Sequence, residues 1–341
     1  MPNMVERLWL FVLVVATILA LACNTHSQAA DQRSKLLTQV GAIPLEGVEG
    51  RIDHLGLDAK HRRLFVAALG NNTVEVIDLA TGKVTQQIKN LRAPQGIGFA
   101  PESDRLAVAN DEDGSFRLFD GTSQQTAAID LRDDADNVRY DVSSRRFWVG
   151  YGVGGLAAID PTSGKLVARV KLKAHPESFQ LETKGKRIFV NVPGANQVAV
   201  VNRETGKVIG KFAVTEASAN FPMALDEADH RLFIGCRHPA TLLVLDTATG
   251  RTIAALDIVG DTDDVFYDAN YKRIYVSGGD GRITVISRAT ADTYEVSGQI
   301  VTATGARTSF LVPETGRFYV AVPRRGAQKA ELRVFTVTDV K

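Results

Sequence analysis

The sequence predicts an all-β fold, a seven-bladed β-propeller of four-stranded blades that an N-terminal strand closes. First, an arginine followed by β-branched and aromatic residues recurs seven times, at intervals of 41 to 44 residues. Second, a turn resembling Asp-x-x-Thr-Gly-Lys recurs with the same period. Third, the last repeat lacks its fourth strand, whereas a strand-like segment precedes the first repeat. A fixed period of this length indicates a repeat architecture.

Each repeat divides into four short strands, here labelled a to d. In the first repeat these are Asp53–Asp58, Arg63–Leu69, Thr73–Leu79 and Val84–Leu91. Valine, isoleucine and phenylalanine in strands b and c suit a pleated, half-buried surface. The recurring arginines that open strand b are Arg63, Arg105, Arg146, Arg187, Arg231, Arg273 and Arg317.

The turn between strands c and d has a structural cause. It begins at Asp78, Asp160, Asn202 and Asp246, with weaker forms at Asp120 and Ser287. An Asp or Asn side chain can bond the turn backbone, and glycine accepts a positive φ angle. Acidic residues end strand a at Asp58, Asp141, Glu182, Asp226 and Asp268. We expect each to pair with the arginine that follows it across the a–b turn.

The two ends of the repeat region complement each other. The last repeat supplies Thr308–Val312, Arg317–Val322 and Glu331–Val337, and Leu36–Leu45 resembles a strand d. Pairing the two would close the ring and remove its open edge. The propeller is therefore expected over residues 36–341. No helical pattern separates the strands, which argues against an α/β fold, and an open β-solenoid is the main rival.

The first 22 residues are predicted to be a signal peptide. Arg7 precedes an apolar run of 15 residues, Leu8–Ala22, which is short for a membrane span. Cys23 follows Ala20-Leu21-Ala22 and resembles the lipidated cysteine of bacterial lipoproteins, although Ala20 replaces the usual leucine. Lipidation at Cys23, ordinary cleavage there or near Ala29, and an uncleaved anchor remain the alternatives. Residues 23–35 are expected to form a linker, and the protein is expected to be periplasmic or secreted, with Cys23 as its one route to a membrane.

The net charge limits the classes of partner, and the second cysteine is expected to have no chemical role. The chain has 40 Lys and Arg against 39 Asp and Glu, a net charge of +1. This balance provides no general attraction to nucleic acid or anionic membranes. The second cysteine, Cys236, lies in an apolar stretch and is expected to be buried and inert.

The repeat resembles the YVTN/YncE-type β-propeller family. The resemblance rests on RLFVAALGNNTVEVIDLATGK (63–83), RIFVNVPGANQVAVVNRETGK (187–207) and RIYVSGGDGRITVISRAT (273–290), and it covers about residues 36–341. Blades two and six depart from it because their turns lack Gly-Lys. The resemblance implies an extracytoplasmic propeller, and for some members nucleic-acid binding has been proposed. A quinone-dependent dehydrogenase is disfavoured because the tryptophan that docks its blades is missing after each turn.

A polar group is expected where the strands a begin, at one opening of the central channel, which we call the axial mouth. Aligned repeats place ionisable residues there, whereas the surrounding strands are apolar. The candidate ligand-binding residues are Arg51, Asp53, His54, Asp134, Asp136, Asn137, His175, Glu177, Asp263, Asp264 and Arg307. Clustered ionisable groups in a concavity are typical of binding and catalytic sites. A merely solvated channel remains an alternative.

No cofactor is assigned from the sequence, although these carboxylates and histidines suit a divalent metal such as Ca²⁺, Mn²⁺ or Zn²⁺. The HExxH and G-x-S-x-G motifs are absent. Asn110–Ser115 superficially resembles a calcium loop but lacks the distal glutamate, so it is predicted to be a hairpin turn. His61 and His230 fall in a–b turns on the opposite face, where we expect them to be exposed.

The favoured function is a binding or scaffold propeller outside the cytoplasm, with a small-molecule ligand or a protein partner at the axial mouth. The first alternative is a metal-dependent hydrolase or lyase of lactonase type, with a carboxylate or His54 as general base. The second is nucleic-acid binding, which rests on family analogy and is disfavoured by the neutral charge. The basic loop Pro323–Lys329 could contact an anionic partner on the same face.

Overall fold

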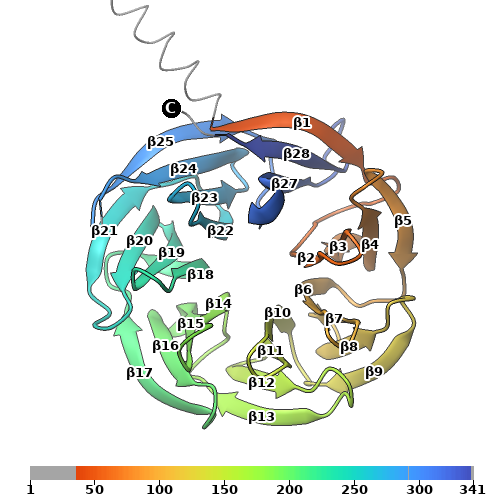
Figure 1. Ribbon diagram of the computed structural model, residues 1–341, viewed down its shortest axis with the longest axis horizontal. Coiled ribbons are helices and arrows are strands. Elements are labelled where there is room, and N and C mark those ends of the chain that lie inside the picture. The colour runs from red at the N-terminus through yellow and green to blue at the C-terminus, as the bar shows by residue number, and fades with distance from the viewer. Residues whose placement is uncertain (1–35, 291, 339–341) are drawn as a thin grey trace, which may run out of the picture.

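The computed structural model describes residues 36–290 and 292–338 and confirms the predicted propeller. Seven four-stranded antiparallel sheets stand around a central axis (Figure 1). In each blade the strands follow one another outward from the axis, and three single 3₁₀ turns, η1 (Leu69–Asn71), η2 (Pro193–Ala195) and η3 (Pro313–Thr315), connect strands. No helix in these residues is long and apolar enough to span a bilayer. The signal peptide, Cys23 and the 23–35 linker lie outside the described residues.

The strands of the first four blades have the following bounds. Blade 1 contains β2 (Leu55–Asp58), β3 (Arg63–Ala68), β4 (Thr73–Asp78) and β5 (Lys83–Ile88). Blade 2 contains β6 (Pro94–Ala100), β7 (Arg105–Asn110), β8 (Ser115–Phe119) and β9 (Gln125–Asp130). Blade 3 contains β10 (Ala135–Asp141), β11 (Arg146–Tyr151), β12 (Gly155–Ile159) and β13 (Leu166–Lys171). Blade 4 contains β14 (Phe179–Leu181), β15 (Arg187–Val192), β16 (Gln197–Asn202) and β17 (Lys207–Ala213).

The remaining blades complete the ring. Blade 5 contains β18 (Ser218–Asp226), β19 (Arg231–His238), β20 (Ala240–Asp246) and β21 (Thr252–Asp257). Blade 6 contains β22 (Thr262–Asp268), β23 (Arg273–Gly278), β24 (Arg282–Arg288) and β25 (Tyr294–Val301). Blade 7 contains β26 (Ser309–Val312), β27 (Arg317–Val322), β28 (Glu331–Val337) and β1 (Leu37–Pro44).

The N-terminal strand closes the ring as predicted. β1 runs antiparallel to β28 at the perimeter (Figure 1), from the pair Leu37–Val337 to the pair Pro44–Glu331. Leu37 packs with residues of blade 6, and Ile43 packs with residues of blade 1. One short strand therefore joins three consecutive blades.

The hydrophobic core lies between neighbouring blades and not in one central cluster. Between blades 3 and 4, for example, Trp148 is 1% exposed and packs with Phe179 and Ile188. Each such cluster buries the facing surfaces of two sheets, which is the main stabilising term for a repeat protein. The inner strands surround the axis, and a cavity lies between them.

The structure confirms that the c–d turn motif has a structural cause. Gly82 has a φ angle of +64°, and the Asp78 carboxylate accepts a hydrogen bond of 2.7 Å from the backbone N–H of Thr81.

Cys236 is buried in β19, and burial raises the pKa of its thiol to about 12, so the thiolate hardly forms near neutral pH. The segment Asn110–Ser115 is the hairpin between β7 and β8, as expected.

The predicted pairing across each a–b turn is right in two blades. Arg63 pairs with Asp58 at 2.7 Å, and Arg187 pairs with Glu182 at 2.5 Å. The prediction is wrong at the other three sites, which are Asp141, Asp226 and Asp268. Asp141 pairs with Arg203 at 3.3 Å, and Asp226 pairs with Arg288 at 3.3 Å. Arg203 follows β16 of blade 4, and Arg288 ends β24 of blade 6, so each arginine reaches its acidic partner from the next blade. For Asp268, its expected partner Arg273 instead donates to the carbonyl oxygen of Thr338.

Candidate functional site

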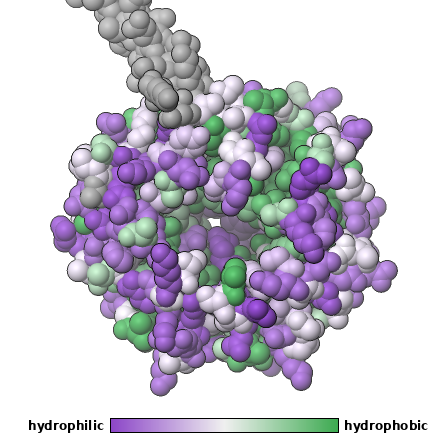
Figure 2. Space-filling model, in the orientation of Figure 1, coloured by the Kyte–Doolittle hydropathy of each residue, from purple (hydrophilic) through white to green (hydrophobic). Residues whose placement is uncertain are grey.

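A cavity of about 390 Å³ lies on the axis and is lined by the inner strands of the blades. Figure 2 shows the molecule hollowed at the centre of the ring. His54, Ser178, Asp264 and Ser309 line the cavity where the inner strands begin. Leu57, Tyr140, Leu225 and Tyr267 line it farther along the same strands. Since all inner strands run in the same direction, the polar residues near their N-terminal ends meet at one opening, the axial mouth.

The structure brings the eleven predicted mouth residues into two groups. The first, which we call the arginine cluster, contains Arg51, Asp53, His54, Asp263, Asp264 and Arg307, from blades 1, 6 and 7. The second, the Asp136 cluster, contains Asp134, Asp136, Asn137, His175 and Glu177, from blades 3 and 4.

Asp263 is the centre of the arginine cluster. Its carboxylate lies 2.6 Å from Arg237, 3.7 Å from Arg51 and 3.9 Å from Arg307. Burial and the nearby Asp53 carboxylate raise the pKa of Asp263 to about 7, against the opposing effect of Arg237. Arg237 also lies 3.9 Å above the ring of Phe221, which fixes its guanidinium plane.

His54 lies between two carboxylates. Its Nδ1 is 3.4 Å from Asp264, and its Nε2 is 3.6 Å from Asp53. Burial alone would lower the pKa of the imidazole, but Asp264 and Asp53 outweigh burial and raise it to about 10. The two carboxylates therefore favour the imidazolium form of His54. The general-base role that the sequence suggested for His54 requires the neutral imidazole and stays a hypothesis. The second oxygen of Asp264 accepts the backbone N–H of Ser309 at 2.8 Å, which links blades 6 and 7.

No arginine forms an ion pair with the Asp136 cluster in the described residues, although the charges of Arg51, Arg139 and Arg237 act on it from a greater distance. The Asp136 side chain is held from one side by the amide of Asn137, at 3.2 Å from Oδ2, whereas its Oδ1 is buried without a hydrogen bond. Burial raises the pKa of Asp136, and burial together with the Asp136 carboxylate raises the pKa of Glu177 to about 9. Burial also raises the pKa of Asp134 to about 6, although His175 opposes this effect. Three acidic side chains therefore gather on this side of the mouth, where burial favours their protonated forms unless a cation or hydrogen-bond donors compensate the charge.

His175 is oriented by the neighbouring loop. Its Nδ1 lies 2.7 Å from the carbonyl oxygen of Gly152 and 3.5 Å from Asp134. A carbonyl oxygen only accepts hydrogen bonds, so Nδ1 carries the proton. In the neutral ring the lone pair is then on Nε2. Asp136, His175 and Glu177 each contribute one ligand atom to a group in which these atoms lie within 4.8 Å of one another.

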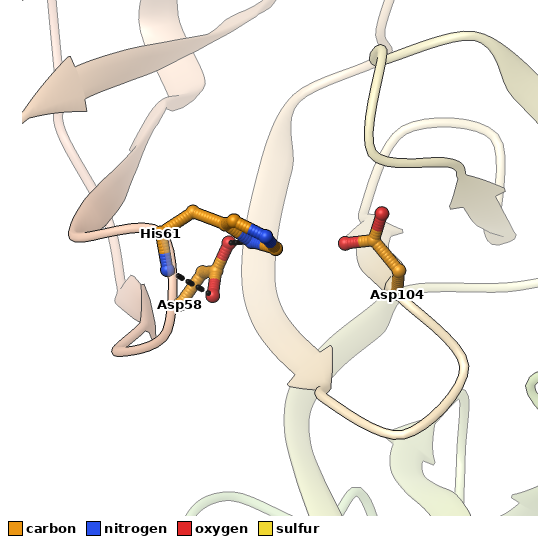
Figure 3. Close-up of side chains that lie close together, drawn as sticks. All are labelled: Asp58, His61 and Asp104. Carbon is orange, nitrogen blue, oxygen red and sulfur yellow. Dashed lines mark hydrogen bonds and ion pairs between the residues drawn. The ribbon is translucent and has the colours of Figure 1, made fainter.

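A second group with such spacing in the described part of the chain has a different character. Asp58, His61 and Asp104 lie in a–b turns on the opposite face, where His61 is exposed as predicted (Figure 3). Asp58 accepts bonds from His61 Nδ1 at 2.8 Å and from Arg63 at 2.7 Å. Its second oxygen accepts the His61 backbone N–H at 3.1 Å. Because Arg63 already balances the charge of Asp58, this group is a structural ion-pair network.

Blade 2 has a glycine, Gly96, in its inner strand β6, at the place where blades 3 and 4 have polar residues. A Cβ atom on Gly96 would collide with the backbone carbonyl oxygen of Asp136, because the inner strands of blades 2 and 3 approach closely there. We expect Gly96→Ala to lower the free energy of unfolding by about 1–3 kcal/mol through overpacking. Urea unfolding measures this change. Gly41→Ala is the control, since nothing lies within 4 Å of the added methyl group. Equal stability of the two variants would contradict the steric argument.

Several mouth and channel residues escaped the sequence analysis. Arg139 and Gln180 also line the cavity, one residue before the positions aligned with Leu57. Arg139 donates to Ser178 at 3.3 Å, and Gln180 donates to the carbonyl of Met223 at 2.8 Å. The alternation of side chains along a strand could have identified them, since residues two apart face the same side. The basic loop Pro323–Lys329 does join β27 to β28, but Arg324 is already paired with Glu49.

Comparisons with known proteins agree with this architecture. No family model matches the chain. The uncharacterized protein YncE of Salmonella typhimurium is 21% identical over 239 residues, which cover 65% of this chain and 67% of YncE, and YncE of Salmonella typhi matches equally. The chain is thus a distant homologue of YncE. A chain of the Kuenenia stuttgartiensis hydrazine synthase structure superposes with a TM-score of 0.71 at 17% identity, covering 82% of this chain and 96% of that one.

A chain from a crystal structure of the mitotic checkpoint complex superposes with a TM-score of 0.73 at 13% identity. The alignment covers 89% of this chain and 92% of that one. At these identities both likenesses concern the propeller fold alone.

Proposed function

We propose that this distant homologue of YncE is a binding propeller whose axial mouth takes a small ligand rich in hydrogen-bond donors. One observation carries the proposal. At the mouth, Asp136 Oδ1 and Asn137 Oδ1 are buried acceptors without a hydrogen-bond partner in the described residues. Buried polar atoms are nearly always bonded, and leaving one unpaired is costly. The arrangement is therefore complementary to a ligand that supplies donors.

The distribution of charge narrows the ligand class. Three arginines, Arg51, Arg237 and Arg307, are matched by the nearby carboxylates Asp53, Asp261 and Asp263. In the Asp136 cluster the described residues form one ion pair, between Asp134 and His175, although the positive charges of Arg237 and His54 also act on Glu177. A ligand with ammonium or hydroxyl groups suits this imbalance, whereas a polyanion does not. The 390 Å³ cavity is of a size suited to a small molecule.

A ligand panel tests the proposal. In EDTA, we expect some amines, amino sugars or polyols to raise the melting temperature of the full chain, and dicarboxylates and phosphates to have no effect. A ligand at 100 times its Kd adds about 2.7 kcal/mol to the free energy of unfolding. Asp136→Asn should remove the shift, because the neutral amide turns a donor toward the ligand.

The control variant for this panel is His61→Ala, which alters the exposed histidine on the opposite face. It should keep the full shift. Stabilisation by anions alone, or a shift that persists in Asp136→Asn, would contradict the proposed ligand class.

The alternatives have weaker support. Nucleic-acid binding would bring phosphates against the mouth carboxylates, and the near-neutral chain provides no compensating attraction. The hydrolase or lyase alternative requires the metal site considered below. A location outside the cytoplasm, lipidation of Cys23 and a protein partner stay proposals, and mass spectrometry of the membrane fraction would test the lipid at Cys23.

A further inference from the structure

We propose that Asp136, His175 and Glu177 bind one divalent transition-metal ion, with zinc as the probe, and leave a coordination position open toward the channel. The inference rests on the proposed function and deepens it, because it concerns the same mouth. It assigns a cation to the buried Asp136 oxygen that accepts no hydrogen bond. It can nevertheless be tested without any organic ligand.

The spacing of the three side chains suits one ion. One ligand atom from each lies within 4.8 Å of those of the other two. Zinc binds histidine nitrogen and carboxylate oxygen at about 2.0–2.2 Å, so ligand atoms around it stand roughly 3–4 Å apart. Small side-chain rotations would close the remaining difference. Asp136 is the second residue of the inner strand β10, and Glu177 precedes the inner strand β14, so neighbouring blades hold two of the ligands.

His175 is oriented in the way that metal-binding histidines usually are. Such a histidine donates its other ring N–H to a carbonyl or carboxylate, which fixes the tautomer and directs the lone pair at the ion. Here Nδ1 donates to the carbonyl of Gly152 at 2.7 Å, with Asp134 at 3.5 Å. The free Nε2 is therefore available as a ligand, and Asp134 and Gly152 act as positioning groups.

The unpaired oxygen of the Asp136 carboxylate is an independent observation that supports cation binding here. Asp136 is 6% exposed, and its Oδ1 accepts no hydrogen bond within residues 36–290 and 292–338. A buried carboxylate is costly unless a cation or donors compensate it. Glu177, also without a side-chain hydrogen bond there, brings a second carboxylate to the same place. A dication would satisfy both.

The comparison with Asp58, His61 and Asp104 shows why spacing alone is insufficient. That group has the same spacing, but Arg63 already neutralises Asp58 and both Asp58 oxygens accept hydrogen bonds. An ion there would have to displace the guanidinium. The Asp136 cluster contains no such arginine bond, so we infer metal binding at the mouth only.

The donor set selects the class of ion. Imidazole favours zinc, iron, copper and nickel, whereas all-oxygen sites suit magnesium and calcium. One imidazole with two carboxylates therefore favours a transition-metal dication over calcium. Three protein ligands leave one position for water or a ligand, as in catalytic zinc sites and unlike closed structural ones.

Isothermal titration of zinc into the full chain, purified without a histidine tag and treated with EDTA, tests the inference. We expect one zinc ion per chain and no comparable heat from calcium. His175→Ala and Glu177→Gln should each weaken binding at least tenfold, since the loss of even an outer-shell partner of a metal typically costs about 10–100-fold in affinity. His61→Ala, at the matched group on the opposite face, should bind zinc like the wild type.

Thermal unfolding without metal checks that each variant is folded. If His175→Ala does not fold, Glu177→Gln decides, since it conserves side-chain shape. Zinc binding of wild-type strength in a folded His175→Ala or Glu177→Gln variant would overturn the inference, as would the absence of zinc binding to the wild type. A ligand-panel failure in EDTA together with zinc binding would reject the proposed organic ligand and leave the metal site standing.

Discussion

A chain that begins at Glu46, and therefore lacks β1, is expected to lose its cooperative unfolding transition. The deletion removes the buried side chains of Leu36, Leu37, Ile43 and Leu45. Burying a side chain of this size stabilises a protein by about 1.5–3 kcal/mol, so the loss is about 6 kcal/mol or more. That loss is comparable to the total stability of many domains. It also exposes the edge of β28 to pairing with other chains.

The control is a chain that begins at Leu36, which should unfold cooperatively, with a melting temperature close to that of the full chain. Calorimetry measures the transitions, and light scattering detects aggregation of the shorter chain. Adding a peptide of residues 36–45 to the shorter chain should restore part of the transition, because β1 pairs with β28 in a defined register. A cooperative, unshifted transition without β1 would show that ring closure is dispensable.

The fold was predictable because its signals are local and repeated. Each β-strand b begins at a recurring arginine, and the spacing of these arginines fixes seven blades. Even β1 followed from local evidence, since the last repeat visibly lacked one strand. The partners of Asp141 and Asp226 were not predictable in this way, because Arg203 and Arg288 reach them from a neighbouring blade. Contacts between repeats depend on the twist of the ring, which a single repeat does not encode.

The residues at the mouth were predictable from the sequence, but the ion pairs that they form were not. Alignment of the repeats placed Asp53, His54 and Asp136 at one end of the channel, because equivalent positions occupy equivalent places. It could not show that Arg237, at the end of β19, reaches Asp263 at 2.6 Å. The division into an arginine cluster with paired charges and an Asp136 cluster without an arginine ion pair in the described residues depends on such distances. The metal proposal therefore needed the structure, although all three of its ligand residues were already candidates.

Replacing His54 with glutamine is expected to destabilise the protein strongly at pH 6 and much less at pH 10. The carboxylates of Asp264 and Asp53 overcome the effect of burial and raise the pKa of His54 from 6.5 to about 10. A group whose pKa is raised on folding stabilises the folded state fully below its unfolded pKa. That contribution is lost as pH rises through the folded value. At 1.36 kcal/mol per unit, the contribution near pH 6 is on the order of 4–5 kcal/mol.

The pH window therefore runs from 6.5 to about 10, and the wild type should lose stability relative to His54→Gln across it. The raised pKa values of Asp263, about 7, and Glu177, about 9, also reduce stability as pH rises. The positive charge of His54 lowers the pKa of both carboxyl groups, so the difference between the two urea-unfolding curves measures the charge of His54 together with its coupling to them. His230→Gln, in an exposed turn on the opposite face, is the control and should change little at any pH. A wild-type advantage that stays constant or grows from pH 6 to 10 would mean that His54 is neutral in the folded protein. The mouth would then carry one more uncompensated negative charge, which would strengthen the case that a bound cation completes it.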